Sequence, residues 1–351
     1  MCSLIVTTAM TGTLPATFVK GFHNEELVRR MEYRTLGSTG LKVSTLALGG
    51  ATLSVLFDKK FDQEEGIKTV HEAIKSGINY IDTAPFYGQG ESERLLGLAL
   101  KDVPREAYYI ATKVARYELD PDRMFNFTAE KTRESVKKSL DLLGLDYVDV
   151  LQVHDVDAAP SLDMVLNETI PVLEEYVKAG KARFIGITAY DVDALKECAE
   201  RAKGRVQVVL SYARYTLLDN TLLRNMKAFK ELHVGVICAA AHALGLLSNA
   251  GPQAWHPGSQ ELQSVGKQAA EVCKQRGVEL GKLAMYYTMQ LEDASTFLIG
   301  IPNRHLLQLN LDVVFNGLTA TEQEVLQYLR ENVFKQSYSW GSTLSTVGDF
   351  K

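Results

Sequence analysis

Short apolar segments alternate with longer amphipathic segments along most of the chain, and this alternation limits the folds that the sequence can adopt. A repeated strand and helix is the pattern of an α/β protein with a parallel sheet and crossover helices. Eight strands are expected, at residues 45–48, 79–82, 109–112, 147–153, 182–188, 206–210, 234–239 and 296–300. Helical patterns include residues 63–76, 128–143, 165–179, 222–231 and 280–290. Eight such units favour a single closed (β/α)8 TIM barrel over a doubly wound sheet, and no G-x-G-x-x-G motif follows an early strand.

The segments outside this alternation are interpreted from their position. Residues 33–36 and 41–43 flank Gly37-Ser-Thr-Gly40, which predicts a β-hairpin able to close one end of the barrel. We expect residues 1–30 to form an N-terminal extension, residues 31–336 the barrel and residues 337–351 a C-terminal tail. Residues 244–260 are an irregular stretch after the seventh strand, and residues 303–315 a helix after the eighth. Because loops after the strands build the active face of such a barrel, both segments are candidate covers of a cofactor or substrate.

The composition of the chain limits the classes of partner that it is expected to bind. A formal net charge of −5 gives no general electrostatic reason to bind nucleic acid or an anionic membrane, so small molecules are the expected partners. The early apolar run at residues 4–6 is too short to span a bilayer. The four cysteines lie far apart, with no C-x-x-C pair and no histidine cluster at metal-ligand spacing. These features predict a reduced, cytosolic protein without a bound metal, as a monomer or weak homodimer.

Reactive side chains follow three consecutive strands of the expected barrel. Asp82 and Tyr87 follow the second strand, Lys113 the third and His154 the fourth. A tyrosine is a weak acid, with an ordinary pKa of about 10, but a neighbouring lysine cation favours its phenolate and a carboxylate keeps that lysine charged. A histidine that donates to the reacting oxygen would polarise a carbonyl. Each residue alone is more typical of a helix cap, a packed aromatic ring or a core histidine, but the four together predict a proton-transfer site.

These residues belong to longer motifs that resemble the aldo-keto reductase superfamily over residues 31–334. The motifs are LGSTGLKVS at 36–44, GINYIDTAPFYG at 77–88, Lys113, LDYVDVLQVH at 145–154, GKARFIGIT at 180–188 and the segment 300–310. The resemblance implies a nicotinamide cofactor bound across the barrel mouth without a Rossmann domain. It also implies a catalytic tetrad of Asp82, Tyr87, Lys113 and His154, which would assist hydride transfer to or from a carbonyl or hydroxyl carbon.

The same resemblance assigns cofactor contacts to the strand ends and to the segment after the eighth strand. The implied residues are Gly50, Asp82, Thr188, Tyr212, Ala239, Leu244, Gly300, Ile301, Asn303 and Asn310. The chain departs from the family pattern at several of them. The usual Ser-Asn pair is Thr188-Ala189, a tyrosine, Tyr212, replaces the usual glutamine, and Ala239 replaces the aromatic ring that often stacks on the nicotinamide. Stacking must then come from elsewhere, for example from Tyr212, or be weaker.

The expected cofactor is NAD, with NADP as the alternative. Members that use NADPH usually hold the 2′-phosphate with a lysine and an arginine, and these positions are Gly300 and Leu306 in this chain. Discrimination of a 2′-phosphate rests on charge-assisted hydrogen bonds to such cations. Arg304, beside His305, lies outside the usual register and is the argument against this preference.

Four further segments resemble the L-galactose dehydrogenase branch of the superfamily: KVARY at 113–117, HD at 154–155, LSY at 210–212 and GPQAWHP at 251–257. This branch implies oxidation of a sugar's anomeric hydroxyl to a lactone with NAD. Substrate candidates on these segments are Arg116, Tyr117, Trp255 and His256, although a packed surface tryptophan is an equal interpretation of Trp255. A general NADPH-dependent carbonyl reductase and a non-catalytic redox-sensing subunit are the competing functions.

Overall fold

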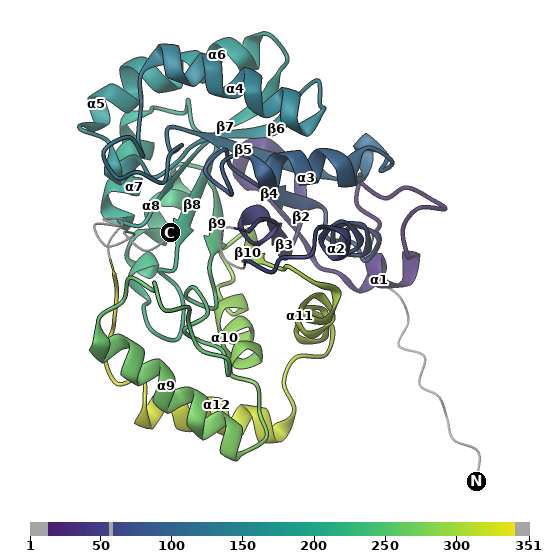
Figure 1. The fold of residues 1–351 in the computed structure, drawn as a ribbon, viewed down its shortest axis with the longest axis vertical. Helices are drawn as coiled ribbons and strands as arrows, with labels where there is room; N and C mark the ends of the chain where they lie inside the picture. The colour runs from purple at the N-terminus through teal and green to yellow at the C-terminus, as the bar shows by residue number, and fades with distance from the viewer. Residues whose placement is uncertain (1–12, 56–58, 341–351) are drawn as a thin grey trace.

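Eight parallel strands close into one barrel in the computed structural model, which describes residues 13–55 and 59–340 (Figure 1). Each strand pairs with its neighbours in chain order, and the last strand closes the barrel against the first. The strands are β3 (Leu46–Gly49), β4 (Tyr80–Asp82), β5 (Tyr109–Val114), β6 (Val148–Val153), β7 (Ala182–Ala189), β8 (Val208–Tyr212), β9 (Gly235–Ala239) and β10 (Thr296–Gly300). The predicted (β/α)8 barrel is therefore confirmed, with strand limits that differ by two residues at most.

Helices surround the barrel, and several begin at a side-chain cap. Asp62, Thr128 and Asp191 each accept backbone N–H groups at a first turn, which satisfies donors that lack a partner within the helix. These helices are α2 (Gln63–Lys75), α3 (Glu91–Leu100), α4 (Ala129–Leu143), α5 (Leu162–Met164), α6 (Ile170–Lys178), α7 (Val192–Arg201), α8 (Met226–Glu231), α10 (Leu280–Met289) and α11 (Arg304–Asn316). In the described ranges, no helix is both long enough and apolar enough to cross a membrane.

Two expected helices are divided in the structure. The helix expected at residues 165–179 begins as a π-helical turn, Val165–Thr169, before α6. Pro171 lies in the first turn of α6, where it has no N–H to continue the ordinary hydrogen-bond ladder. The helix expected at residues 222–231 is a 3-10 turn, Thr221–Asn225, followed by α8.

A β-hairpin closes the end of the barrel at which the strands begin. β1 (Tyr33–Thr35) and β2 (Lys42–Ser44) pair antiparallel, as the sequence predicts. Leu36, Leu41 and Val43 pack with the side chains that fill the barrel interior. The Ser38 N–H donates to the His233 carbonyl at 2.9 Å, immediately before β9. Among the described residues, the hairpin therefore covers the end of the barrel at which the strands begin.

The segments on either side of the barrel extend its packing. The described part of the expected N-terminal extension includes α1 (Glu25–Arg30), and Thr17 accepts a hydrogen bond from the buried Asn79 amide at 2.9 Å. Near the other terminus, α9 (Gln260–Gln275) and α12 (Ala320–Asn332) lie side by side and share a second apolar core with α10 (Figure 1). This second core supports the long loop that follows β9, because Leu246 and Leu247 of the loop are buried in it.

The close approach of the hairpin to β9 gives a test of the plug. A Cβ atom at Gly235 would lie 2.6 Å from Leu36 Cδ1 and 2.8 Å from the Gly37 nitrogen. Gly235→Ala should therefore lower the free energy of unfolding, measured by urea denaturation, by about 1–3 kcal/mol because the hairpin has to move. The matched control is Gly281→Ala in α10, where the nearest atom is 3.4 Å away and helix propensity favours alanine. Equal stability of the two variants would contradict the proposed tight contact.

Candidate active site

The polar side chains predicted to react meet at the open end of the barrel, where β4, β5 and β6 finish. Asp82 is the last residue of β4, Lys113 lies near the end of β5, and His154 follows β6. Lys113 is paired in register with Gln152 on the neighbouring strand. Because alternate residues of a strand share a face, Gln152 and His154 point the same way as Val150, which lies in the barrel interior.

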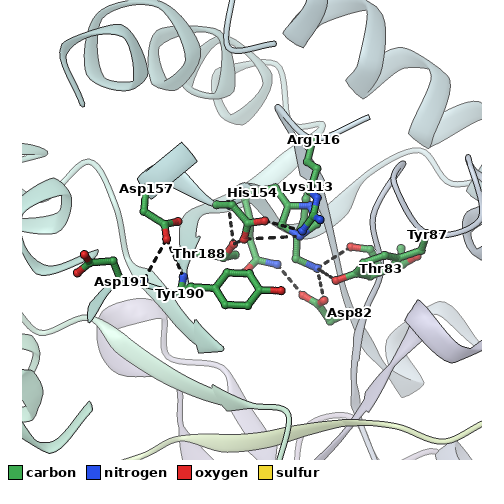
Figure 2. A network of polar contacts seen from close by, with 12 residues as sticks. Asp82, Thr83, Tyr87, Lys113, Arg116, His154, Asp157, Thr188, Tyr190 and Asp191 are labelled. Atoms are coloured by element: carbon green, nitrogen blue, oxygen red, sulfur yellow. Dashed lines mark hydrogen bonds and ion pairs between the residues drawn. The ribbon is translucent and has the colours of Figure 1, made fainter. Parts of the chain in front are cut away.

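Lys113 is the centre of this group (Figure 2). Its ammonium group donates to the Asp82 carboxylate, to the Thr83 carbonyl at 2.9 Å and to the Tyr87 hydroxyl at 3.2 Å. The other oxygen of Asp82 accepts from Gln152 Nε2 at 2.6 Å. Lys113 and Asp82 are both 1% exposed, so the ion pair is shielded from water. The structure therefore brings Asp82, Tyr87 and Lys113 into one connected network.

The environment sets the charge states of this network. Burial acts to lower the pKa of Lys113, but the Asp82 carboxylate and the Tyr87 hydroxyl raise it overall, so the lysine stays a cation. Burial raises the pKa of Tyr87 above its ordinary value, and the neighbouring Lys113 cation only opposes that shift. The lysine thus makes the phenolate less costly without making it the resting form at neutral pH.

His154 is neutral in this setting. Burial lowers its pKa well below the usual value, and the Lys113 and Arg116 cations lower it further. Its ring stands perpendicular to the Tyr87 ring, with 5.8 Å between the ring centroids. His154 Nδ1 is buried without a hydrogen-bond partner in the part of the chain that the structure describes. A neutral imidazole beside a tyrosine hydroxyl is able to orient an oxygen atom placed between the two rings.

A second buried ion pair lies beside His154. Arg116 Nη1 donates to the Asp155 carboxylate at 2.8 Å, and the Arg116 guanidinium lies 4.1 Å from the centre of the Phe86 ring. Asp155 has a positive φ of 54°, a conformation that non-glycine residues rarely adopt. Strained backbone of this kind is frequent at functional sites. Arg116 is among the substrate candidates that the sequence predicts. The roles of Asp155 and Gln152 are not predicted from the sequence, although a glutamine within an apolar strand is a signal that points to Gln152.

Two of the other substrate candidates, Tyr117 and His256, contact groups outside this network. The Tyr117 ring faces the Lys131 ammonium of α4 at 5.4 Å. Both ring nitrogens of His256 bond to the backbone, Nε2 to the Ala243 carbonyl and Nδ1 to the Gly258 N–H, each at 3.0 Å. Trp255 is partly buried in the loop that follows β9. Tyr117 and His256 therefore have contacts that hold them within the scaffold.

Comparison with known proteins shows which family this chain matches. Residues 45–331 match the model of the aldo/keto reductase family. The chain belongs to this family. It is 41% identical to an L-galactose dehydrogenase from Arabidopsis thaliana over 81% of this chain and 88% of the relative, and 31% identical to a D-arabinose 1-dehydrogenase from Saccharomyces cerevisiae over 86% and 94%. An aldo-keto reductase structure from Bacillus halodurans, in its holo form, superposes with a TM-score of 0.69 at 28% identity, covering 85% of this chain and 96% of that chain.

Aldo/keto reductases are oxidoreductases of alcohol and carbonyl groups that use nicotinamide cofactors, and the barrel mouth of this chain offers groups that fit one. Tyr212, at the end of β8, has a partly exposed ring and is paired in register with the small Ala239. The buried atom Gln152 Oε1, on the interior face of β6, has no hydrogen-bond partner within the described ranges. An aromatic ring and an unsatisfied amide oxygen at the same end of the barrel suit a flat ring that carries an amide.

The residues implied as cofactor contacts all lie at this open end or on α11. Gly50, Thr188, Tyr212, Ala239, Leu244, Gly300, Ile301, Asn303 and Asn310 lie at strand ends, in the loops that follow them or on α11 itself. Three of them already use their side chains in hydrogen bonds within the protein. Asn310 Nδ2 donates to the Leu306 carbonyl at 2.7 Å. Thr188 Oγ1 accepts from the Asp155 N–H at 2.9 Å, and the Asn303 side chain caps α11 by accepting from the Leu306 N–H at 2.9 Å.

Asp157 gives the loop beside the site a pH-dependent stability. Its carboxylate accepts the N–H groups of Tyr190 and Asp191 at 3.2 and 3.0 Å (Figure 2), yet burial and the nearby Asp155 raise its pKa to about 6. A raised carboxyl pKa means that the fold favours the protonated form. This contribution to stability is present below the unfolded pKa and is lost as the pH rises to about 6.

Asp157→Asn should remove this pH dependence, because an amide oxygen still accepts both N–H groups but carries no charge. The melting temperature of the variant relative to the native protein should therefore increase between pH 4 and pH 7, as measured by differential scanning calorimetry. A difference that stays constant over this range would show that Asp157 does not titrate as described.

Proposed function

We propose that this protein is an NAD-preferring aldose 1-dehydrogenase in which Asp82, Tyr87, Lys113 and His154 are the catalytic residues. The observation that carries the proposal is the contact of the buried Lys113 ammonium with both Asp82 and the Tyr87 hydroxyl. This arrangement supports proton transfer by Tyr87, because the only charge that forms on the phenol would face a fixed cation.

In the proposed reaction, a bound nicotinamide supplies hydride chemistry at its C4 position. The residues of this chain accept and transfer the proton. For alcohol oxidation, Tyr87 would first lose its own proton to solvent, at a cost that the Lys113 cation lowers. The resulting phenolate would then accept the substrate hydroxyl proton as the C–H hydride leaves. His154, held neutral by burial, orients the substrate oxygen without competing for the proton. Asp82 acts through Lys113, which it keeps charged and in position.

A sugar is the proposed substrate. Support comes from two relatives, whose names are L-galactose dehydrogenase and D-arabinose 1-dehydrogenase. Support also comes from the Arg116 and Asp155 pair next to His154, since planar charged side chains beside an aromatic ring suit a substrate with several hydroxyl groups. We propose that Arg116 and Trp255 contribute to substrate selection.

The preference for NAD rests on the segment that follows β10. Gly300, Ile301 and Leu306 offer no cation to a 2′-phosphate, and a dianion without charged donors is poorly compensated. From the cysteine pattern, we further propose that the protein is cytosolic. We expect it to act as a monomer or weak homodimer.

Removal of the Tyr87 hydroxyl tests the catalytic assignment. Tyr87→Phe keeps the ring but has no exchangeable proton, so turnover should fall by roughly 10²- to 10⁴-fold while cofactor affinity changes little. Steady-state kinetics and a fluorescence titration with NADH measure the two effects separately. Tyr109→Phe, at the opposite end of β5, is the matched control and should retain activity. Near-native turnover in Tyr87→Phe would refute the role of Tyr87.

A substrate panel tests the proposed reaction. L-galactose, L-fucose and D-arabinose should each be assayed with NAD and with NADP, and lactone formation followed for the best sugar. We expect kcat/KM to be about 10- to 100-fold higher with NAD, because each missing charge-assisted hydrogen bond costs about 1.5–3 kcal/mol. No turnover of any aldose, together with NADPH-dependent reduction of simple carbonyl compounds, would favour the carbonyl reductase instead.

A further inference from the structure

Two helices that are distant in the sequence begin side by side at the open end of the barrel. α2 follows β3 and α11 follows β10, and these two strands are neighbours in the closed sheet. Helices of a (β/α)8 barrel start at the end where the strands finish, so both first turns face the barrel mouth. The first turn of α11 belongs to the segment proposed above to set the preference between NAD and NADP.

Glu65, in the first turn of α2, accepts hydrogen bonds from donors at the start of α11. Its carboxylate accepts from Arg304 Nε and Nη2, each at 3.0 Å, and from the Arg304 backbone N–H at 3.1 Å. The hydrogen bonds to Arg304 hold the pKa of Glu65 below its usual value, so the carboxylate is charged at neutral pH. Arg304 is the only arginine or lysine between residues 300 and 310.

These three donors are the kind that a phosphate group would use. A guanidinium with two aligned N–H groups and a free N–H at a helix start form a site suited to an anion. A carboxylate already fills that site, and it would also repel a second anion placed nearby. The exposed Lys68, one turn further along α2, offsets part of the Glu65 charge but carries no hydrogen bond to α11 among the described residues.

We propose that Glu65 determines the nucleotide preference of this protein by holding Arg304 and excluding a 2′-phosphate. The inference rests on the proposed use of a nicotinamide cofactor and assigns its selectivity to a residue of α2. A ribose 2′-hydroxyl is able to donate a hydrogen bond to a carboxylate, whereas a phosphate dianion is not. Glu65 therefore favours the nucleotide with a free 2′-hydroxyl, and Arg304 becomes available to a phosphate only when Glu65 loses its charge.

The test is a binding titration that does not depend on turnover. NADH and NADPH are titrated by fluorescence into the native protein, Glu65→Gln, and Glu65→Gln combined with Arg304→Ala. Glu65→Gln should tighten NADPH by about tenfold or more, the equivalent of one charge-assisted hydrogen bond. The double variant should lose that gain. Glu72→Gln is the matched control, because it removes the same charge from α2 where the carboxylate bonds to Gln308, and it should leave the ratio of affinities nearly unchanged.

The outcomes separate this inference from the proposed function. If the native protein binds NADH but Glu65→Gln leaves the NADPH affinity unchanged, the role of Glu65 is refuted and the proposed function stands. If Glu72→Gln tightens NADPH as much as Glu65→Gln, the preference follows the net charge of α2 and the assignment to Glu65 is equally refuted. If neither nucleotide binds the native protein, the proposed function itself fails.

Discussion

The buried ion pair between Lys113 and Asp82 is the interaction on which the site depends. A lysine that is 1% exposed would lose its charge without a close anion, because burial disfavours the ammonium form. Asp82 supplies that anion, and Gln152 fixes its second oxygen. Three neighbouring strands each provide one member of this arrangement, so the register of the barrel sets its geometry. The closed sheet is thereby a condition of the chemistry proposed for Tyr87.

The two ends of the barrel differ in packing and polarity, and we propose that only one of them binds ligand. At the end where the strands begin, the hairpin fills the interior with Leu36, Leu41 and Val43. The backbone of Gly37 in this hairpin lies close to Gly235 of β9. At the other end, polar side chains gather, Gln152 Oε1 and His154 Nδ1 have no hydrogen-bond partner among the described residues, and the backbone is strained at Asp155. Unsatisfied polar atoms and strain cost stability, and a well-packed opposite end is where the fold can offset that cost.

The sequence predicted most of what depends on local pattern. The eight strands follow from apolar runs, and the catalytic candidates follow from their position immediately after those runs, where the topology of a barrel brings them together. Contacts between segments distant in the sequence were not predictable in the same way. Glu65 and Arg304 are separated by 239 positions, and the sequence of neither helix indicates that the two residues form an ion pair. His256 shows the same limit, because its two backbone hydrogen bonds exist only once the loop has folded.

One rule of electrostatics has opposite consequences at the two carboxylates that flank the barrel mouth. Asp82 is shielded from water, so its charge fixes a cation beside the Tyr87 hydroxyl, and in our proposal that cation stabilises a phenolate. Glu65 lies at the surface, and in our proposal its charge removes a cation from the reach of a ligand. The buried pair is hard to change, since either partner alone would be an uncompensated charge in the interior. The surface pair contributes little to stability, so substitution there would alter nucleotide choice while leaving the fold and the reacting groups intact.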